Sequence, residues 1–221
     1  MREILRTPRL VLRRLEAADV RRLVELDSDP EVMRYLSGGV PTPRAVIETE
    51  VLPRFLSYDA GPPGLGFFAA ERRADGAFLG WFHLRPAQHG GEGELEIGYR
   101  LRREAWNRGY ATEGSRALVR LAFVELGAQR VVAYTLAVNL ASRRVMEKAG
   151  LSLEATFVQP ELSHIPGWEQ GSVRYALERS AWQATLDSAA ARGDEAQETA
   201  ARRQDEAPAL PGPRGPSGGE R

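Results

Sequence analysis

The first third of the chain combines one alternating apolar pattern with several helical ones. From Arg9 to Arg14 the leucines at positions 10 and 12 alternate with their neighbours, which predicts the first strand. The apolar positions from Val20 to Asp27 have helical spacing, Asp29-Pro30 restarts a short helix, and Thr42-Pro43 offers a cap with proline at the first helical position. We expect helices to cover this stretch and Pro53 to kink or end the last of them.

The middle of the chain changes to strand patterns. Gly66 to Arg72 and Phe78 to Leu84 are apolar and rich in aromatic residues, and Ala74-Asp75-Gly76 between them is typical of a hairpin turn. Further strands are predicted at Glu94–Leu101, Arg130–Val138, Leu151–Val158 and Ser172–Leu177, and helices at Ala111–Leu126 and Ala141–Ala149, the latter closed by Gly150. This order predicts an α+β sandwich with helices on both faces of the sheet and excludes a Rossmann fold.

The composition changes abruptly near Thr185. Beyond it the 221-residue chain contains mainly Ala, Glu, Arg and Gln, followed by a run rich in proline and glycine from Pro208 to Gly219. A segment with so few large apolar side chains cannot offset its ordering entropy by burial. We therefore expect one domain over residues 1–184 and a disordered tail over residues 185–221.

Charge and cysteine content narrow the classes of function. Lys plus Arg equals Asp plus Glu at 30 each, so no overall field favours nucleic acid or an anionic membrane as a direct partner. The sequence has no cysteine, which excludes thiol nucleophiles, disulfides and cysteine metal sites. No stretch reaches ~18 consecutive apolar residues, and the N-terminus does not have the pattern of a secretory signal. A cytoplasmic protein is expected.

The sharpest motif runs from a strand through a glycine turn into a helix. Leu95 to Leu101 leads through Trp106 to the segment Asn107-Arg108-Gly109-Tyr110-Ala111-Thr112-Glu113. Unpaired N–H groups at the helix start would attract an anion such as pyrophosphate, and Arg103 and Arg108 would add positive charge. The alternative is a tight turn before a core helix. Neither a P-loop nor a dinucleotide fingerprint competes with this motif.

This segment resembles the pyrophosphate-binding motif of the GNAT superfamily of N-acetyltransferases. Gly109 and Ala111 match its [RQ]-x-x-G-x-[GA] pattern, and Trp106 replaces the usual Arg or Gln, as in the branch of ribosomal-protein N-terminal acetyltransferases. The segment from Asn139 to Leu151 matches the family's second pattern, N-x-x-S-x-x-x-x-E-K-x-G-[FL]. The resemblance extends in order over about residues 7–182.

The resemblance implies a GNAT fold, a mixed and mostly antiparallel sheet of about six to seven strands that splays between the fourth and fifth strands. The splay would begin after Leu101 and Val138, and the pantetheine of acetyl-CoA would pair with the backbone of Ile97 to Leu101. Neither a metal nor a covalent enzyme intermediate is implied. The residues expected at the cofactor are Ile97, Tyr99, Leu101, Arg103, Arg108, Gly109, Tyr110, Ala111, Thr112, Asn139, Ser142 and Arg144. Asn139 is also suited to a plain helix cap, and Arg143 and Arg144 to a solvated face.

Direct attack on the thioester requires a neutral amine, and therefore a base or a water chain to one. The resemblance indicates Glu96, although Glu96 could equally face solvent beside Glu94; His83 is the second candidate. Many relatives place an acidic tyrosine where this chain has Met146, so Ser142 is the expected proton donor. Tyr99 and Tyr110 are expected to serve packing rather than acid catalysis.

The acceptor is expected to bind between the helices from Val32 to Tyr58 and the loop from Gln159 to Gly171, which contains His164 and Trp168. Trp81 and Trp106 could line the same cleft, although a core position is their usual place. The resemblance implies a protein N-terminal amine or a small-molecule amine, including an antibiotic or metabolite. Alternatives are a catalytically inert acyl-CoA-binding module and, more distantly, a phosphate-binding domain of another fold. A homodimer is possible.

Overall fold

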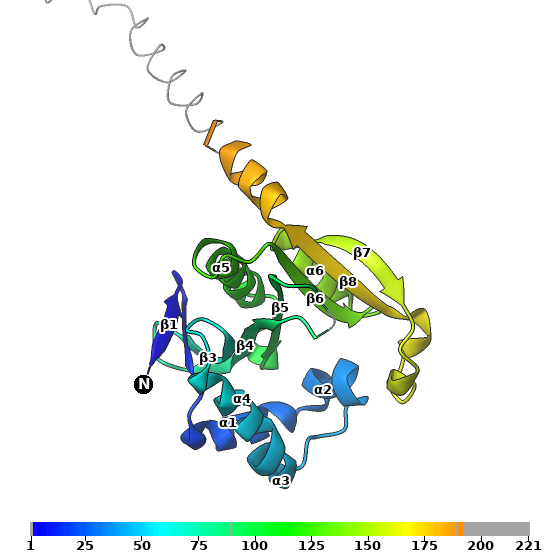
Figure 1. Cartoon of the computed structure of the whole chain (residues 1–221). Helices are drawn as coiled ribbons and strands as arrows, with labels where there is room; N and C mark the ends of the chain where they lie inside the picture. Colours follow the sequence, from blue (N-terminus) through cyan, green and yellow to red (C-terminus); the bar gives the residue numbers. More distant parts are fainter. Residues whose placement is uncertain (1, 89, 189, 192–221) are drawn as a thin grey trace, which may run out of the picture. The chain divides into compact units, whose positions relative to one another are not determined.

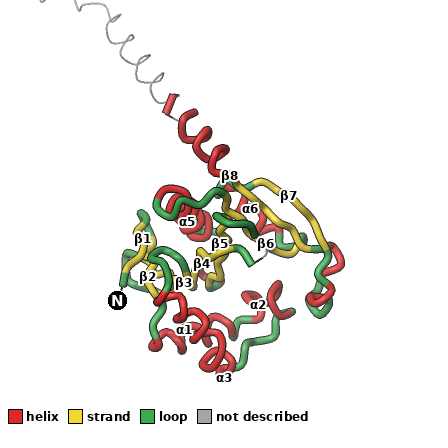
Figure 2. The backbone as a smooth tube through the Cα atoms, viewed as in Figure 1, coloured by secondary structure: helices red, strands yellow, loops and turns green. Residues whose placement is uncertain are grey.

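The computed structural model describes residues 2–88, 90–188 and 190–191. The chain divides into two compact units, Met1–Arg179 and Ser180–Arg221. The first unit contains a curved sheet with helices packed against it (Figures 1 and 2). In the second unit the described residues are helical over 180–188. The tail expected at 185–221 lies almost entirely outside the described residues, so the boundary after residue 184 stays a prediction.

Within the described residues the sheet has eight strands in the order β1-β2-β3-β4-β5-β6-β8-β7, and among them only the β5–β6 pair is parallel. The predicted mixed, mostly antiparallel sheet is confirmed, but six to seven strands was too few. The strands are β1 (Glu3–Arg6), β2 (Leu10–Arg14), β3 (Gly66–Arg72), β4 (Phe78–Pro86), β5 (Glu94–Leu101), β6 (Arg130–Leu136), β7 (Ser152–Phe157) and β8 (Ser172–Glu178). The short edge strand β1 escaped prediction because its sequence EILR shows too little alternation.

Helices lie on both faces of the sheet, as predicted. Leucines of α1 and Phe55 of α4 share one apolar core with Phe67 of β3 and Trp81 of β4. On the other face α5 packs so closely that a Cβ on Gly114 would lie 2.3 Å from the ring of Phe82. The α-helices are α1 (Val20–Asp27), α2 (Pro30–Ser37), α3 (Arg44–Val46), α4 (Leu52–Leu56), α5 (Tyr110–Val124) and α6 (Leu140–Lys148). Short 3-10 helices are η1 (Ala17–Asp19), η3 (Ser57–Ala60), η4 (Arg103–Ala105), η5 (Pro160–Leu162) and η6 (Trp168–Gln170).

Prolines shape the helices before β3. Pro30 opens α2, as the sequence predicted, and the Asp29 carboxylate accepts a hydrogen bond from the Glu31 amide. Pro43 is itself the residue before α3 instead of its first residue, which corrects the predicted cap by one position. Pro53 does not end the helical run, since it lies in the first turn of α4. A π-helical turn, η2 (Ile47–Val51), precedes it and leads directly into α4.

None of the helices in the described part of the chain combines the length and the apolar character needed to span a bilayer.

Candidate active site

Strands β5 and β6 separate partway along their length. They pair at Glu94 with Arg130, at Leu95 with Val131 and at Glu96 with Val132, and no further pair joins them. From Ile97 to Leu101, β5 pairs only with β4. The predicted splay is confirmed, but its predicted start after Leu101 and Val138 was wrong. Because the separation begins after Glu96, a stretch of β5 backbone is left available to a ligand that pairs as an extra strand would.

The start of α5 has the geometry of an anion site. Gly109 precedes the helix with φ 80°, and no side chain caps the first N–H groups. A Cβ on Gly109 would meet only the Arg9 guanidinium, at 3.2 Å, so the approach to the backbone is open. Arg103 is already paired with Asp29, at 2.8 Å, whereas Arg108 is exposed. Tyr110 is buried beneath the Arg9 guanidinium, in keeping with the packing role expected for it.

Thr7 and Arg9, near the N-terminus, hold this turn through hydrogen bonds that no sequence pattern indicated. One oxygen of Glu113 accepts hydrogen bonds from the Thr7 hydroxyl at 2.6 Å and the Arg9 amide at 2.8 Å. The other pairs with the Arg9 guanidinium, which also donates to the Arg108 carbonyl at 2.8 Å. Burial opposes ionisation of Glu113, but these bonds outweigh it and hold its pKa below the ordinary value. Thr7, Arg9 and Glu113 thus order the anion site through contacts with one another.

The second motif places Ser142 beside Tyr99. The Asn139 side chain accepts from the Ser142 amide at 3.2 Å, which confirms its capping role at α6. The hydroxyls of Ser142 and Tyr99 lie 3.0 Å apart, and burial raises the pKa of Tyr99 to about 12. Tyr99 is therefore part of a polar pair, not a packing residue alone. Met146 is buried in α6, on the side opposite solvent.

The two arginines of that motif have different surroundings. Arg143 donates to the Tyr175 hydroxyl at 3.1 Å and the Ala137 carbonyl at 3.0 Å, so it is half-buried and holds α6 to the sheet. Arg144 is exposed on the helix surface. Of the two, only Arg144 remains available to a phosphate.

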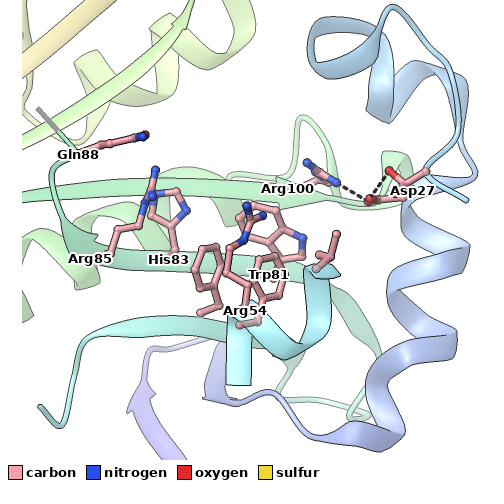
Figure 3. A pocket seen from close by; sticks show the side chains of 11 residues that line it. Asp27, Arg54, Trp81, His83, Arg85, Gln88 and Arg100 are labelled. Carbon is pink, nitrogen blue, oxygen red and sulfur yellow. Dashed lines mark hydrogen bonds and ion pairs between the residues drawn. The ribbon is translucent and has the colours of Figure 1, made fainter. Parts of the chain in front are cut away.

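A cavity of about 300 Å³ lies on the opposite face of β4 and β5, where these strands meet the helices before β3 (Figure 3). We call it the arginine pocket. In Figure 3, Arg85 and His83 lie together at one end, and Arg100 and Asp27 at the other. The lining residues are Asp27, Thr42, Val51, Arg54, Phe55, Phe67, Trp81, His83, Arg85, Gln88 and Arg100.

Glu96 lies directly behind this pocket. Its two carboxylate oxygens accept hydrogen bonds from the same terminal nitrogen of Arg85, at 2.9 and 3.0 Å. The Oε1 atom also lies 3.3 Å from the Nε2 atom of His83. Glu96 and Glu94 are both buried, so the alternative in which they face solvent is wrong. Burial opposes ionisation of Glu96, but His83 and Arg85 outweigh it and hold its pKa below the usual range.

His83 is buried at the pocket wall, and neither ring nitrogen makes a well-aligned hydrogen bond with any described residue. Burial lowers its pKa more than the nearby Glu96 raises it, and the charges of Arg85 and Arg54 lower it further. The imidazole is thus neutral near pH 7. It packs on the backbone of Gly98, where a Cβ would lie 2.5 Å from its Cε1 atom.

Strand alternation separates the two predicted catalytic residues. Glu96, Gly98 and Arg100 share the face of the arginine pocket, and they lie opposite Arg85, His83 and Trp81 of β4. Tyr99 points to the other face, where it meets Ser142. The structure therefore does not bring Glu96 and Ser142 together. They flank β5 from opposite sides, next to the point where β5 and β6 separate.

The two expected acceptor regions contribute unequally. Thr42, Val51, Arg54 and Phe55 of the first region line the arginine pocket, but no residue of the loop from Gln159 to Gly171 does. That loop approaches the C-terminus of α2, where a Cβ on Gly38 would lie 3.2 Å from the His164 carbonyl. Among the tryptophans, Trp81 is both buried and part of the pocket wall. Trp106 is partly exposed and donates from its ring to the Leu101 carbonyl, so it supports the turn before α5.

Comparisons with known proteins agree on one family. Residues 9–152 match the family described as acetyltransferase (GNAT) domain. The chain is 36% identical over 166 residues to the FsC-acetyl coenzyme A-N(2)-transacetylase of Aspergillus fumigatus, a match that covers 72% of this chain and 69% of the relative. A GNAT-family acetyltransferase from Bacillus anthracis superimposes with a TM-score of 0.65 at 25% identity, over 80% of this chain and 99% of that structure.

A more distant structure shares the fold alone. It is a spermidine N-acetyltransferase from Vibrio cholerae in complex with CoA and spermine, with a TM-score of 0.64 at 19% identity, over 80% of this chain and 99% of that structure.

Proposed function

Because the chain belongs to the acetyltransferase (GNAT) domain family, we propose that it acetylates the primary amine of a small molecule held in the arginine pocket. The family match and the Aspergillus relative identify it as an acetyl-CoA-dependent N-acetyltransferase. A cavity of about 300 Å³ suits a small molecule, and the Vibrio structure is of an enzyme named for a small amine.

The observation that carries the proposal is the position of His83 and Glu96. His83 lines the arginine pocket as a neutral imidazole, and Glu96 faces its Nε2 atom from behind. His83 takes the proton that the amine loses as it attacks, and Glu96 stabilises the imidazolium that results. In this assignment His83 is the general base that contacts the substrate, and Glu96 is its anionic partner.

The residues around the β5–β6 separation fit acetyl-CoA. Backbone of Ile97 to Leu101 would pair with the pantetheine arm, and amides from Arg108 to Thr112 would hold the pyrophosphate. Arg144 is exposed and suited to a further phosphate. Bound acetyl-CoA supplies the activated acetyl group. The fit rests on the edge of β5 from Ile97 to Leu101 that has no β6 partner, and on the start of α5, where no side chain caps the first N–H groups.

Tyr99 and Ser142 supply a proton on the other side of β5. The new carbon–nitrogen bond forms as the carbon–sulfur bond breaks, and the thiolate that leaves needs a proton. The hydroxyl pair is next to Ile97–Leu101 on the α5–α6 side. Tyr99 keeps its proton at neutral pH, since its ordinary pKa of 10.0 already lies above that pH and burial raises it further. We assign the donor role to this pair, with Ser142 as the member expected from the sequence.

A protein N-terminal amine is the second candidate acceptor. It is favoured by the segment from Trp106 to Glu113, which resembles the branch of ribosomal-protein N-terminal acetyltransferases. Peptides with free N-termini therefore belong beside small amines in the first substrate panel.

Two measurements test the proposal. Acetyl-CoA is titrated calorimetrically into the wild type, into Gly109→Trp, whose side chain would cover the anion site, and into Gly127→Trp. Gly127 is the matched control, because it also has positive φ and a Cβ there would meet no atom within 4 Å in the part of the chain that the structure describes. We expect binding to be lost only in Gly109→Trp. Thiol release with the amine panel should then fall about 10²–10⁴-fold in His83→Gln and in Glu96→Gln.

Unchanged turnover in both of these variants would exclude His83 as the general base and Glu96 as its partner. No binding of acetyl-CoA by the wild type would exclude the cofactor site itself.

A further inference from the structure

Every carboxylate at the arginine pocket already has a partner. Asp27 is paired with Arg100 at 2.5 Å through one oxygen and accepts from the Thr42 hydroxyl at 3.0 Å through the other. Glu96 is occupied by Arg85 and faces His83. A protonated amine that entered the pocket would therefore find no free carboxylate among the described residues.

Positive charge in the pocket exceeds negative charge. Three arginines line it, and Asp27 and Glu96 balance only Arg100 and Arg85. Arg54, the third, has no carboxylate partner among the residues that the structure describes; its guanidinium lies 5.7 Å from the centre of the Phe55 ring. The charge of Arg54 reaches His83, whose pKa it helps to lower. The pocket thus contains one formally unbalanced cation close to the proposed base.

The two paired arginines also have donors to spare. Arg85 contacts Glu96 through a single terminal nitrogen, and Arg100 contacts Asp27 through a single terminal nitrogen. The Nε atoms of both are buried without a hydrogen-bond partner in the described part of the chain. A carboxylate accepts two guanidinium donors at once, so the terminal nitrogen that each arginine leaves unpaired among the described residues is the donor that a ligand carboxylate would use.

Three of the other lining residues are aromatic, and Val51, Thr42 and Gln88 complete the lining. Phe55 and Phe67 stack at 3.9 Å between ring centres, and Trp81 meets both edge-on. This aromatic surface favours an apolar body on the ligand. Of the two polar uncharged lining residues, Thr42 already donates to Asp27, which leaves Gln88 as a further hydrogen-bonding group.

We infer that the acceptor is an amine that also carries a carboxylate on an apolar body, and that Arg54 is the residue that selects for the carboxylate. The inference rests on the proposed function, because it assigns the substrate class of the same pocket. It sets this protein apart from enzymes of the same fold that act on polycationic amines, because the excess charge of the pocket repels a second ammonium group.

The test uses two probes of equal shape and opposite charge, 3-phenylpropanoate and 3-phenylpropylamine. Each is titrated calorimetrically into the full-length protein saturated with CoA, in the wild type, Arg54→Gln, Arg54→Lys and Arg44→Gln. Arg44 is the matched control, because it lies on the neighbouring helix, pairs with Glu48 and is not part of the pocket lining.

We expect the carboxylate to bind the wild type at least about tenfold more tightly than the amine, the scale of one charge-assisted hydrogen bond. Arg54→Gln should abolish that preference, Arg54→Lys should restore part of it, and Arg44→Gln should leave it unchanged. Equal or tighter binding of the amine, absence of carboxylate binding, or an unchanged preference in Arg54→Gln would each overturn the inference.

A turnover assay distinguishes failure of the inferred carboxylate selectivity from failure of the proposed acetyltransferase function. L-phenylalanine and L-phenylalaninamide are compared in the thiol-release assay with the wild type. If both are acetylated equally, the proposed function stands and the selectivity for a carboxylate does not. If acetyl-CoA itself does not bind, the proposed function has failed.

Discussion

Gly98→Ala offers a direct test of how His83 is positioned. A Cβ at residue 98 would lie 2.5 Å from Cε1, 2.8 Å from Nε2 and 3.1 Å from Nδ1 of the imidazole. Ordinary contacts between carbon atoms begin at about 3.5 Å, so the ring must move by roughly 1 Å. Gly98 does not have positive φ, and the alanine backbone itself is unstrained. The substitution therefore acts through the imidazole.

The size of the effect follows from that displacement. A shift of about 1 Å in a reacting group costs on the order of 10²-fold in rate, so kcat should fall by about that factor. Overpacking a buried site costs about 1–3 kcal/mol of stability, which should lower Tm by several degrees without unfolding the domain. Acetyl-CoA binding should change little, because the added methyl group faces the arginine pocket and not the gap beside β6.

Thiol release gives kcat and KM, calorimetry gives the acetyl-CoA dissociation constant, and thermal melting gives Tm. Gly91→Ala is the control, since a Cβ at residue 91 would meet no atom of the described residues within 4 Å and its φ is not positive. The reasoning would be refuted if Gly98→Ala lost no more activity than Gly91→Ala, or if it lost activity only through weaker acetyl-CoA binding.

Three further changes test other parts of the site and fold. Tyr99→Phe should lower kcat on the order of 10²-fold with unchanged acetyl-CoA affinity, because it removes the hydroxyl 3.0 Å from Ser142; thiol release at full rate would contradict the donor role. Glu113→Gln should lower stability by about 1.5–3 kcal/mol and raise the acetyl-CoA dissociation constant, because it weakens the hydrogen bonds from Thr7 and Arg9 that hold the turn at the anion site; melting and calorimetry measure the two effects. Asp19→Ala should cost about 3 kcal/mol in urea unfolding, because it removes a partner of the buried Arg13. Burial opposes ionisation of Asp19, but Arg13 outweighs burial and lowers the pKa of Asp19. In the wild type the stability that Asp19 contributes is therefore complete above its ordinary pKa of 3.8 and is lost as pH falls through the lowered pKa. A pH series of unfolding free energies that shows no such loss would contradict the assignment.

The sequence predicted individual elements well because each carried its own local signal. The hairpin at Asp75-Gly76, strand β5 and the Gly150 end of α6 follow directly from turn residues and periodicity. The splay between β5 and β6 was expected only through the family resemblance, and its start was misplaced. Alternation shows where a strand runs, but it does not show where the strand loses its neighbour.

The site was harder to predict because its contacts join distant segments. Glu113 meets Thr7 and Arg9 only when β2 is brought beside α5, and no short motif shows that meeting. The contact between His83 and Glu96 depends on the β4–β5 register, which a glycine-containing loop between the two strands conceals. Residue type suggested Glu96 and His83 one at a time; only the register makes them a pair.

Strand β5 organises the chemistry because its side chains alternate between two compartments. Even-numbered positions from Glu96 to Arg100 face the arginine pocket, and Tyr99 faces α6. The same strand loses its β6 partner after Glu96, so backbone between these compartments is left open for the thioester arm. In the proposed mechanism, removal of a proton from the amine and delivery of a proton to the thiolate would therefore occur on opposite faces of one strand. The two proton-handling pairs share no side chain. Changes at His83 or Glu96 should therefore alter how the rate depends on the amine, whereas changes at Tyr99 or Ser142 should alter the rate at which the thiol leaves. A double variant such as Glu96→Gln with Tyr99→Phe should therefore be additive in free energy to within about 0.5 kcal/mol, and strong coupling would mean that both pairs act on the same proton.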